Sequence, residues 1–186
     1  MRKLLVFNSV TVDGYFTDKN NDMSWAHAAQ SDPEWNEFVA QNAKSEGELV
    51  FGRVTYQMME SFWPTPAAAQ SFPEVAAGMN KAPKVVFSRT LDQVTWNNTR
   101  LLKGDLVAEV KKLKEEPGDG LVIIGSGSLV AQLAPSGLID EYQMVVNPLI
   151  LGAGRTMFEG VKEKLKLTLT DSRAFKNGNV VLSYKS

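Results

Sequence analysis

Cysteine is absent from the 186-residue sequence, and histidine occurs once, at His27. The absence of cysteine excludes disulfide bonds, thiol catalysis and cysteine-ligated zinc, and a single histidine excludes a histidine-rich metal site. No apolar run approaches the roughly 20 residues that span a bilayer. Asn8, Thr11 and Asp13 interrupt the apolar start of the chain before the core of a signal peptide is complete. We therefore expect a cytoplasmic protein with no metal site and no membrane partner.

A large excess of either charge is also missing, because 20 lysine and arginine residues stand against 21 aspartate and glutamate residues. The net charge of −1 gives little attraction to nucleic acid, so no nucleic-acid partner is expected. The hydrophobic fraction of 44% and the charged fraction of 22% are typical of a globular domain. Without a linker or an internal repeat, the sequence predicts a single domain over residues 1–186.

Apolar strand-like segments alternate with amphipathic helical segments along most of the chain. The predicted strands are 3–10, 48–51, 84–88, 121–125 and 141–146, and the predicted helices are 33–44, 53–62, 72–81, 105–114 and 128–133. This alternation predicts an α/β fold of three layers, α-β-α, around a mostly parallel sheet.

Two segments depart from the alternation. Residues 165–175 alternate with period two, and Asn177-Gly178 predicts a tight turn into 179–185, so the sheet is expected to end in an antiparallel C-terminal hairpin. The irregular stretch 63–73, WPTPAAAQSFP, predicts a surface loop.

The stretch LVIIGSGSLVAQL, residues 121–133, is a buried strand that breaks at two glycines and continues as a helix. Gly125 and Gly127 permit backbone angles that other residues avoid, and Ser126 or Ser128 is suited to cap the helix. The stretch is therefore either a phosphate-binding turn or an ordinary strand-to-helix turn. A Rossmann dinucleotide fingerprint is disfavoured, since its third glycine and its later carboxylate are both missing.

Three short motifs occur in order along the chain, FGRVTY at 51–56, VVFSRT at 85–90 and IIGSGSL at 123–129. Together they resemble the dihydrofolate reductase-like superfamily. SVTVDGYF near the start and NPLILGAGRTMF at 147–158 are similar to the reductase domain of the bifunctional riboflavin-biosynthesis deaminase–reductase and its stand-alone bacterial relatives. DMSW at 22–25 is similar to the mobile active-site loop of dihydrofolate reductases. The resemblance implies the dihydrofolate reductase-like fold, NADPH as cofactor, a small-molecule substrate and a homodimer.

The resemblance also implies which residues hold the cofactor. Arg53 and Arg89, with Ser88, would hold the 2′-phosphate, since a guanidinium fork suits a phosphate dianion. Each arginine alone is more typical of a solvated charge, but the pair at adjacent strand ends favours the phosphate. Ser126 stands where the family has the second glycine of a pair. The residues assigned to the pyrophosphate are Gly52, Thr55, Gly125, Ser126, Gly127, Ser128 and Leu129.

The substrate side is assigned on fewer residues. Asp13, at the end of the first strand, is the leading catalytic and substrate-binding candidate, or else a turn carboxylate beside a glycine. Trp25 is expected to cover the nicotinamide as a catalytic residue, or else to serve in ordinary packing. Arg155 either binds a substrate phosphate or lies on a loop. His27 is expected to be an exposed residue rather than a catalytic acid.

In dihydrofolate reductases, a carboxylate on the first helix binds the pterin. When positions are counted back from FGR without gaps, the corresponding position in this sequence is Asn36. The chain also lacks the cysteines of a zinc deaminase domain, so it corresponds at most to the reductase half. The resemblance thus implies an NADPH-dependent reductase of a pyrimidine- or pterin-like substrate, most like 5-amino-6-(5-phosphoribosylamino)uracil reductase. The alternatives are pterin reduction of the dihydrofolate reductase type and a nucleotide-binding protein without strong catalysis. The apolar segment 140–151 is either a dimer interface or central core.

Overall fold

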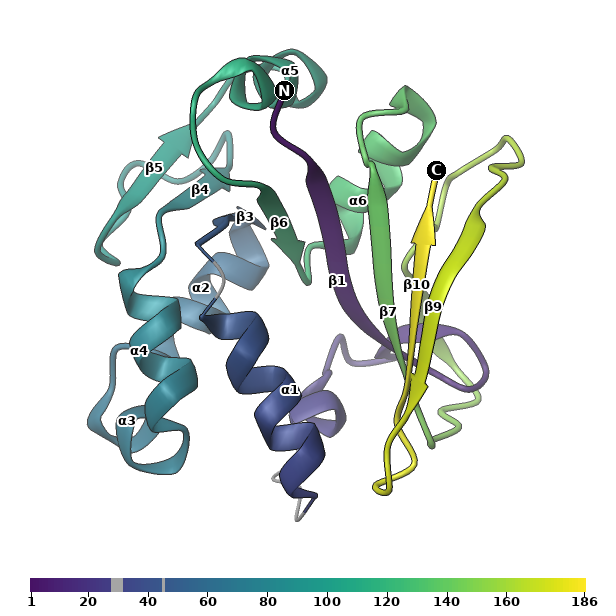
Figure 1. Cartoon of the computed structure of the whole chain (residues 1–186). Helices are drawn as coiled ribbons and strands as arrows, with labels where there is room; N and C mark the ends of the chain where they lie inside the picture. Colours follow the sequence, from purple (N-terminus) through teal and green to yellow (C-terminus); the bar gives the residue numbers. More distant parts are fainter. Residues whose placement is uncertain (28–31, 45) are drawn as a thin grey trace.

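The computed structural model describes residues 1–27, 32–44 and 46–186, and its main feature is an eight-stranded sheet (Figure 1). The strand order is β5-β4-β3-β6-β1-β7-β10-β9. The pairs from β5 through to β7 are parallel, and the pairs of β10 with β7 and with β9 are antiparallel. The strands of this sheet are β1 (Leu4–Thr11), β3 (Glu48–Gly52), β4 (Lys84–Phe87), β5 (Thr99–Leu102), β6 (Leu121–Ile124), β7 (Glu141–Asn147), β9 (Thr168–Ala174) and β10 (Val180–Lys185).

Helices cover both faces of the sheet, as the fold class predicted. The helices are α1 (Pro33–Ala43), α2 (Arg53–Phe62), α3 (Pro66–Ser71), α4 (Pro73–Lys81), α5 (Leu106–Glu115) and α6 (Gly127–Leu133), with 3-10 helices η1 (Ser24–His27) and η2 (Ala134–Ser136). Side chains of α1, α2 and α4 pack on one face, and side chains of α5 and α6 pack on the other. A second, two-stranded sheet pairs β2 (Tyr15–Asp18) with β8 (Gly154–Thr156). The predicted three-layer fold with a mostly parallel sheet is confirmed.

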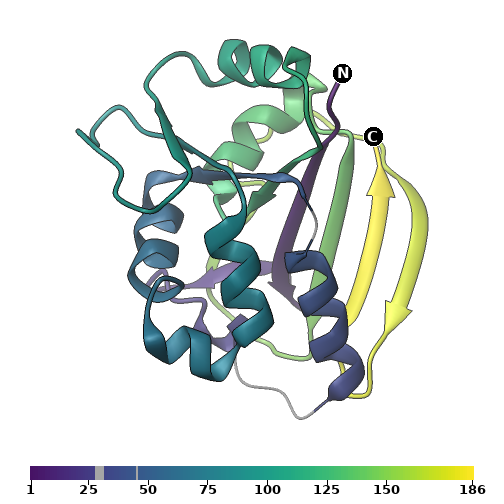
Figure 2. The same ribbon diagram turned by 60° about the vertical axis from the view of Figure 1, so that its left-hand side comes forward.

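The C-terminal hairpin is also confirmed, and Figure 2 shows β9 and β10 in yellow at the outer edge of the sheet. Its first strand begins at Thr168, three residues later than the period-two pattern predicted. The predicted surface loop at 63–73 is wrong, because α3 forms there. Thr65 caps that helix by accepting a hydrogen bond from the Ala68 N–H, and Pro66 occupies its first turn.

The segment 140–151 belongs mainly to the core rather than to a free surface. Its strand β7 is hydrogen-bonded to β1 on one side and to β10 on the other. Tyr142 and Val145 are buried, whereas Leu149 and Ile150 after the strand are exposed. The strand itself therefore has no unpaired edge to offer a second chain.

The start of α1 is fixed by Asp32, which is buried at the helix N-cap. One carboxylate oxygen accepts hydrogen bonds from the Glu34 and Trp35 N–H groups, and the other accepts from the Asn177 N–H, at 3.0 Å, in the hairpin turn. Burial opposes the charged form, but these backbone donors outweigh it and lower the pKa of Asp32. The same carboxylate thus caps a helix and attaches the hairpin to it.

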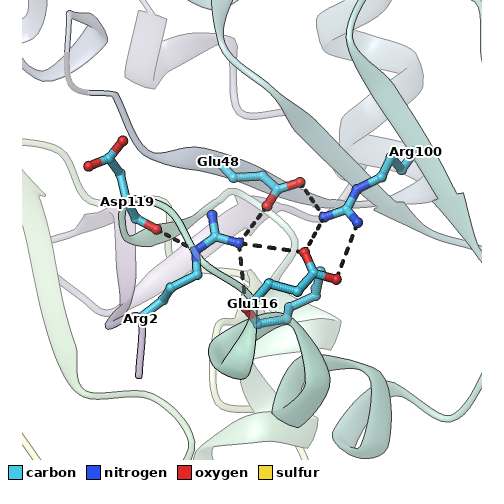
Figure 3. A network of polar contacts seen from close by, with 6 residues as sticks. Arg2, Glu48, Arg100, Glu116 and Asp119 are labelled. Atoms are coloured by element: carbon cyan, nitrogen blue, oxygen red, sulfur yellow. Dashed lines mark hydrogen bonds and ion pairs between the residues drawn. The ribbon is translucent and has the colours of Figure 1, made fainter.

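At the amino ends of the parallel strands, four charged side chains form a network (Figure 3). The buried Glu48 carboxylate accepts from Arg2 at 2.9 Å and from Arg100 at 2.8 Å. Glu116, beyond α5, pairs with Arg100 at 3.0 Å. Hydrogen bonds to Glu116 and to Glu48 hold the pKa of the Arg100 guanidinium above its usual value. The network ties the N-terminus, β3, β5 and the end of α5 together.

We predict that Glu48→Gln destabilises the fold by up to about 3 kcal/mol, since it leaves buried arginine charge with one partner fewer. Urea unfolding measures the change. The matched control is Lys112→Gln, which breaks the exposed pair with Glu109 and should change stability by less than about 1 kcal/mol. Equal effects of the two substitutions would contradict a structural role for the buried network.

Candidate functional site

The candidate site lies where β3, β4 and β6 end, because parallel strands bring their carboxyl ends to one edge of a sheet. In the sheet, β3 and β6 are neighbours. β4, which follows β3 in the chain, lies on the β3 side of this pair, whereas β7, which follows β6, lies on the β6 side, beyond β1. The chain therefore leaves β3 and β6 in opposite directions, with α2 on one face and α6 on the other. Such a switch point in strand order is where open α/β sheets bind ligands.

Ser126 joins the two strand ends at this point. Its hydroxyl accepts a hydrogen bond from the Gly52 N–H at 2.8 Å, and its own N–H donates to the Thr55 hydroxyl oxygen at 3.0 Å. Gly125 and Ser126 both have left-handed backbone angles, with φ of +64° and +56°. A Cβ on Gly125 would lie 2.7 Å from a Thr55 carbon, so only glycine fits there.

These contacts correct one expectation about the turn. Neither Ser126 nor Ser128 caps α6, because the helix has no side-chain cap hydrogen bond and the Ser126 hydroxyl is directed to Gly52 instead. The left-handed geometry of Ser126 brings its hydroxyl to the neighbouring strand end. The turn is consequently a bridge between two strand ends rather than an ordinary capped turn.

The site retains several free hydrogen-bond donors. The N-terminus of α2 has no side-chain cap, so the N–H groups of its first turn lack intrahelical acceptors. Thr55 accepts from Ser126, which leaves its own O–H available to donate. Gly127 and Ser128 begin α6, whereas the Leu129 N–H already donates to the Ser126 carbonyl. The uncapped start of α2 carries partial positive charge, which suits a phosphate group.

The two predicted arginines follow adjacent parallel strands, β3 and β4. Arg53 is exposed and its guanidinium contacts the neutral Gln57 at 3.0 Å. Arg89 is exposed and forms no ion pair within the described ranges of the chain. Ser88 is buried, and its hydroxyl accepts from the backbone N–H groups of Thr90 and Leu91, so it shapes the turn that carries Arg89. Both guanidinium groups thus have donors left for an anion.

Asp13 lies at the end of β1, but its carboxylate already has partners in the chain. It accepts from the Thr11 hydroxyl at 2.6 Å and from the Gly152 N–H at 2.8 Å, with a longer contact to the Leu151 N–H at 3.3 Å. The Thr11 hydroxyl, followed by these backbone donors, holds the pKa of Asp13 below its usual value. The carboxylate therefore fastens the loop after β7 to the end of β1, and it stays ionised at neutral pH.

Arg155 and Trp25 are placed differently. Arg155 lines a cavity of about 220 Å³ together with Gly127 and Ser128, so the structure brings it to the start of α6. Its guanidinium pairs with Glu159 at 3.3 Å on the surface. Trp25, in η1, is half-buried, and its indole N–H is buried without an acceptor among the described residues. The side chain of His27 lies outside what the structure describes.

Helix α1 does not present the carboxylate of a pterin site at the position counted from FGR. Asn36 is exposed on that helix. Glu34 pairs with Arg173 at 2.7 Å on the surface, and Asp32 has its oxygens engaged by three backbone N–H groups. Glu37, the remaining carboxylate of α1, is exposed and accepts from the Gln41 side chain at 3.0 Å.

Sequence reasoning missed Asn8, a buried residue of β1. Its side-chain amide donates to the Gly125 carbonyl at 2.9 Å and accepts from the Gly125 N–H at 2.5 Å. The available signal was an asparagine directly after four apolar residues of the first strand, LLVFN, although its partner 117 positions away could not be read from the sequence.

Residues 1–27, 32–44 and 46–186 contain neither a cluster of metal-ligating side chains nor a helix that could span a membrane. In those ranges, histidine, aspartate and glutamate side chains form no group of three that could hold a metal ion. Within the same ranges, every helix is too short or too polar to cross a membrane.

Comparison with known proteins places these features in a family. The family model of the RibD C-terminal domain matches residues 2–181. Uncharacterized protein YyaP of Bacillus subtilis is 27% identical over 183 residues, which cover 98% of this chain and 94% of that protein.

Two solved structures share the fold. A putative riboflavin biosynthesis protein from Shewanella sp. PV-4 has a TM-score of 0.73 at 24% identity, with 98% of each chain covered. A diaminohydroxyphosphoribosylaminopyrimidine deaminase/5-amino-6-(5-phosphoribosylamino)uracil reductase from Thermotoga maritima has a TM-score of 0.69 at 14% identity. The match covers 99% of this chain and 56% of that one. The family match over nearly the whole sequence shows that this chain belongs to the RibD C-terminal domain family.

Proposed function

We propose that this protein is an NADPH-dependent reductase of a small pyrimidine- or pterin-like substrate. The observation that carries the proposal is the convergence of an uncapped α2 N-terminus, the Ser126 bridge and two arginines at one edge of the sheet. The family match and the reductase activity for which the Thermotoga maritima protein is named support the same reaction class. NADPH, when bound, supplies the hydride.

The residues at the strand ends fit the phosphates of this cofactor. Arg53 and Arg89 would hold the 2′-phosphate, because each guanidinium keeps donors free and the two follow neighbouring strands. The N–H groups at the start of α2 and the Thr55 hydroxyl would hold the pyrophosphate on one side. The turn from Gly125 to Ser128 would hold it on the other side, with the Leu129 side chain packed beneath it in the core.

The substrate side is proposed on chemistry and on the relatives. Arg155, beside the start of α6, would bind a phosphate of the substrate. The indole N–H of Trp25, which has no acceptor among the described residues, would donate to a ligand acceptor. Asp13 would shape the cleft as an anion, since its lowered pKa makes it a poor proton donor at neutral pH. The substrate we propose is an aminopyrimidine that carries a phosphorylated ribosyl group, as for 5-amino-6-(5-phosphoribosylamino)uracil reductase.

We predict micromolar NADPH binding that is at least about tenfold tighter than NADH binding, because two guanidinium contacts to the 2′-phosphate are each charge-assisted. Quenching of the fluorescence of the four tryptophans in a titration measures both affinities. Arg53→Ala/Arg89→Ala should abolish the preference, whereas Arg173→Ala, a surface arginine paired with Glu34, should preserve it. Equal affinity of the wild-type protein for both cofactors would remove the 2′-phosphate assignment.

We further predict that the protein oxidises NADPH when it is given phosphoribosylaminopyrimidines. The loss of nicotinamide absorbance measures turnover over a panel that includes those compounds and dihydropterins. Pterin turnover is expected to be slower than pyrimidine turnover, because the described carboxylates at the start of α1 and along it are engaged by backbone N–H groups or lie exposed on the surface. Tight NADPH binding without turnover of any compound would contradict catalysis and would favour a nucleotide-binding protein.

We also propose a homodimer that uses the outer edge of the sheet. Every residue of β9 is exposed, including Leu169, and the exposed Leu165 and Leu167 lie in the segment that leads into this strand. Light scattering should give the mass of two chains for the wild-type protein. Leu167→Lys/Leu169→Lys should give the mass of one chain, because two buried lysines oppose association. A wild-type mass of one chain would refute the dimer.

A further inference from the structure

We infer that Asn8 is a positioning residue that sets the shape of the Gly125–Ser126 turn and, through it, the pyrophosphate contacts at the start of α2. The inference rests on the proposed function. Asn8 touches neither arginine and lies beneath the turn, so its effect on a ligand would pass through the backbone that it holds.

The geometry at Asn8 continues the sheet by one position. The β1–β6 ladder ends with Phe7 opposite Ile124, and the next residues along the two strands are Asn8 and Gly125. At this point β6 turns away from β1, and the side-chain amide of Asn8 replaces the backbone pairing. It binds both the N–H and the carbonyl of Gly125. Its Nδ2 also contacts the Met157 sulfur at 2.9 Å. One side chain thus fixes both hydrogen-bonding groups of Gly125 where the chain enters left-handed geometry.

From Gly125 the constraint passes directly to the residues that face the phosphates. The next residue, Ser126, donates its N–H to Thr55 and accepts from the Gly52 N–H. Gly52 is the N-cap residue of α2, and Thr55 lies in its first turn. A continuous set of hydrogen bonds therefore runs from Asn8 to the uncapped start of α2, and every link joins buried or half-buried groups.

The chemistry of this position requires an amide. Leucine has a similar size but would leave the N–H and carbonyl of Gly125 without partners in a buried place. Aspartate would accept from the N–H, but its second oxygen would face the Gly125 carbonyl and would add negative charge beneath a phosphate site. We therefore expect the turn to relax in both variants, and the contacts of Ser126 with Gly52 and Thr55 to loosen.

The test compares two ligands by tryptophan fluorescence titration in Asn8→Leu and Asn8→Asp. NADPH contains the pyrophosphate, whereas adenosine 2′-monophosphate contains only the part assigned to the arginines. Both variants should weaken NADPH binding by about tenfold or more, the effect of losing one or two hydrogen bonds, and should leave adenosine 2′-monophosphate binding within about twofold. Arg89→Ala should weaken both ligands.

Asn147→Leu is the matched control for lost stability. Asn147 is buried to the same degree as Asn8, and its amide donates to the Val145 and Val10 carbonyls of neighbouring strand positions. Urea unfolding should show a comparable loss of stability in Asn8→Leu and Asn147→Leu, with NADPH affinity reduced only in the former. Should Asn8→Leu fail to fold, the more polar Asn8→Ser replaces it, with the same expected split between the ligands.

Three results would overturn the inference, and they point to different causes. Wild-type affinity for NADPH in the Asn8 variants would refute the role of Asn8 and leave the proposed function intact. Equal loss of affinity in Asn147→Leu would reduce Asn8 to a stabilising residue. If the wild-type protein binds neither ligand, the proposed function fails and the role of Asn8 fails with it.

Discussion

The hydrogen bonds that join the ends of β3 and β6 are the constraint on which the candidate site depends. These strands are neighbours, but the helices that follow them lie on opposite faces of the sheet. Without further contacts, the starts of α2 and α6 would be connected only through the paired strands β3 and β6 that precede them. Ser126 connects them directly, through the Gly52 N–H and the Thr55 hydroxyl. The connection uses the Gly52 amide itself, so the phosphate contacts proposed above fall to the donors that follow it.

The charged side chains at the two ends of the parallel strands differ in whether they are paired. At the amino ends of the strands, Glu48 is buried and both of its arginine partners are satisfied, which fits a role in stability. At the carboxyl ends, Arg53 and Arg89 are exposed and neither is paired with a carboxylate among the described residues. Arginines that stay solvated contribute little to folding, and their donors remain available to an anion. The paired charges that stabilise the fold thus lie at the amino ends of the parallel strands, and the candidate site lies at their carboxyl ends.

The parts of this fold that could be predicted are those whose signal is local. The apolar run at 121–124 and the amphipathic helix after Asp105 are read directly from neighbouring residues. The prolines around α3 suggested a loop, although Pro66 after Thr65 also fits a capped helix start. The short strands β2, β5 and β8 were missed because their residues have mixed polarity and their pairing is set by distant partners.

The same distinction applies to the candidate site. Sequence motifs placed Gly52, Arg53, Arg89 and Gly125 at strand ends. The contacts that these residues make depend on the three-dimensional structure, which a motif does not record. Ser126 contacts a residue 74 positions away and Asn8 one 117 positions away, and neither partner leaves a trace in the local pattern.

Asp13 shows how such long-range contacts change a functional assignment. Its position at the end of β1 suggested direct chemistry on a substrate, yet its carboxylate accepts from the Gly152 N–H and from the Thr11 hydroxyl. Those bonds favour the ionised form and hold the pKa of Asp13 below its usual value. They also hold the loop after β7 close to the turn that leads into β2, whose partner strand β8 carries Arg155. One carboxylate therefore joins two segments that are distant in the sequence, the end of β1 and the loop after β7, and its first role in this structure is to hold them together.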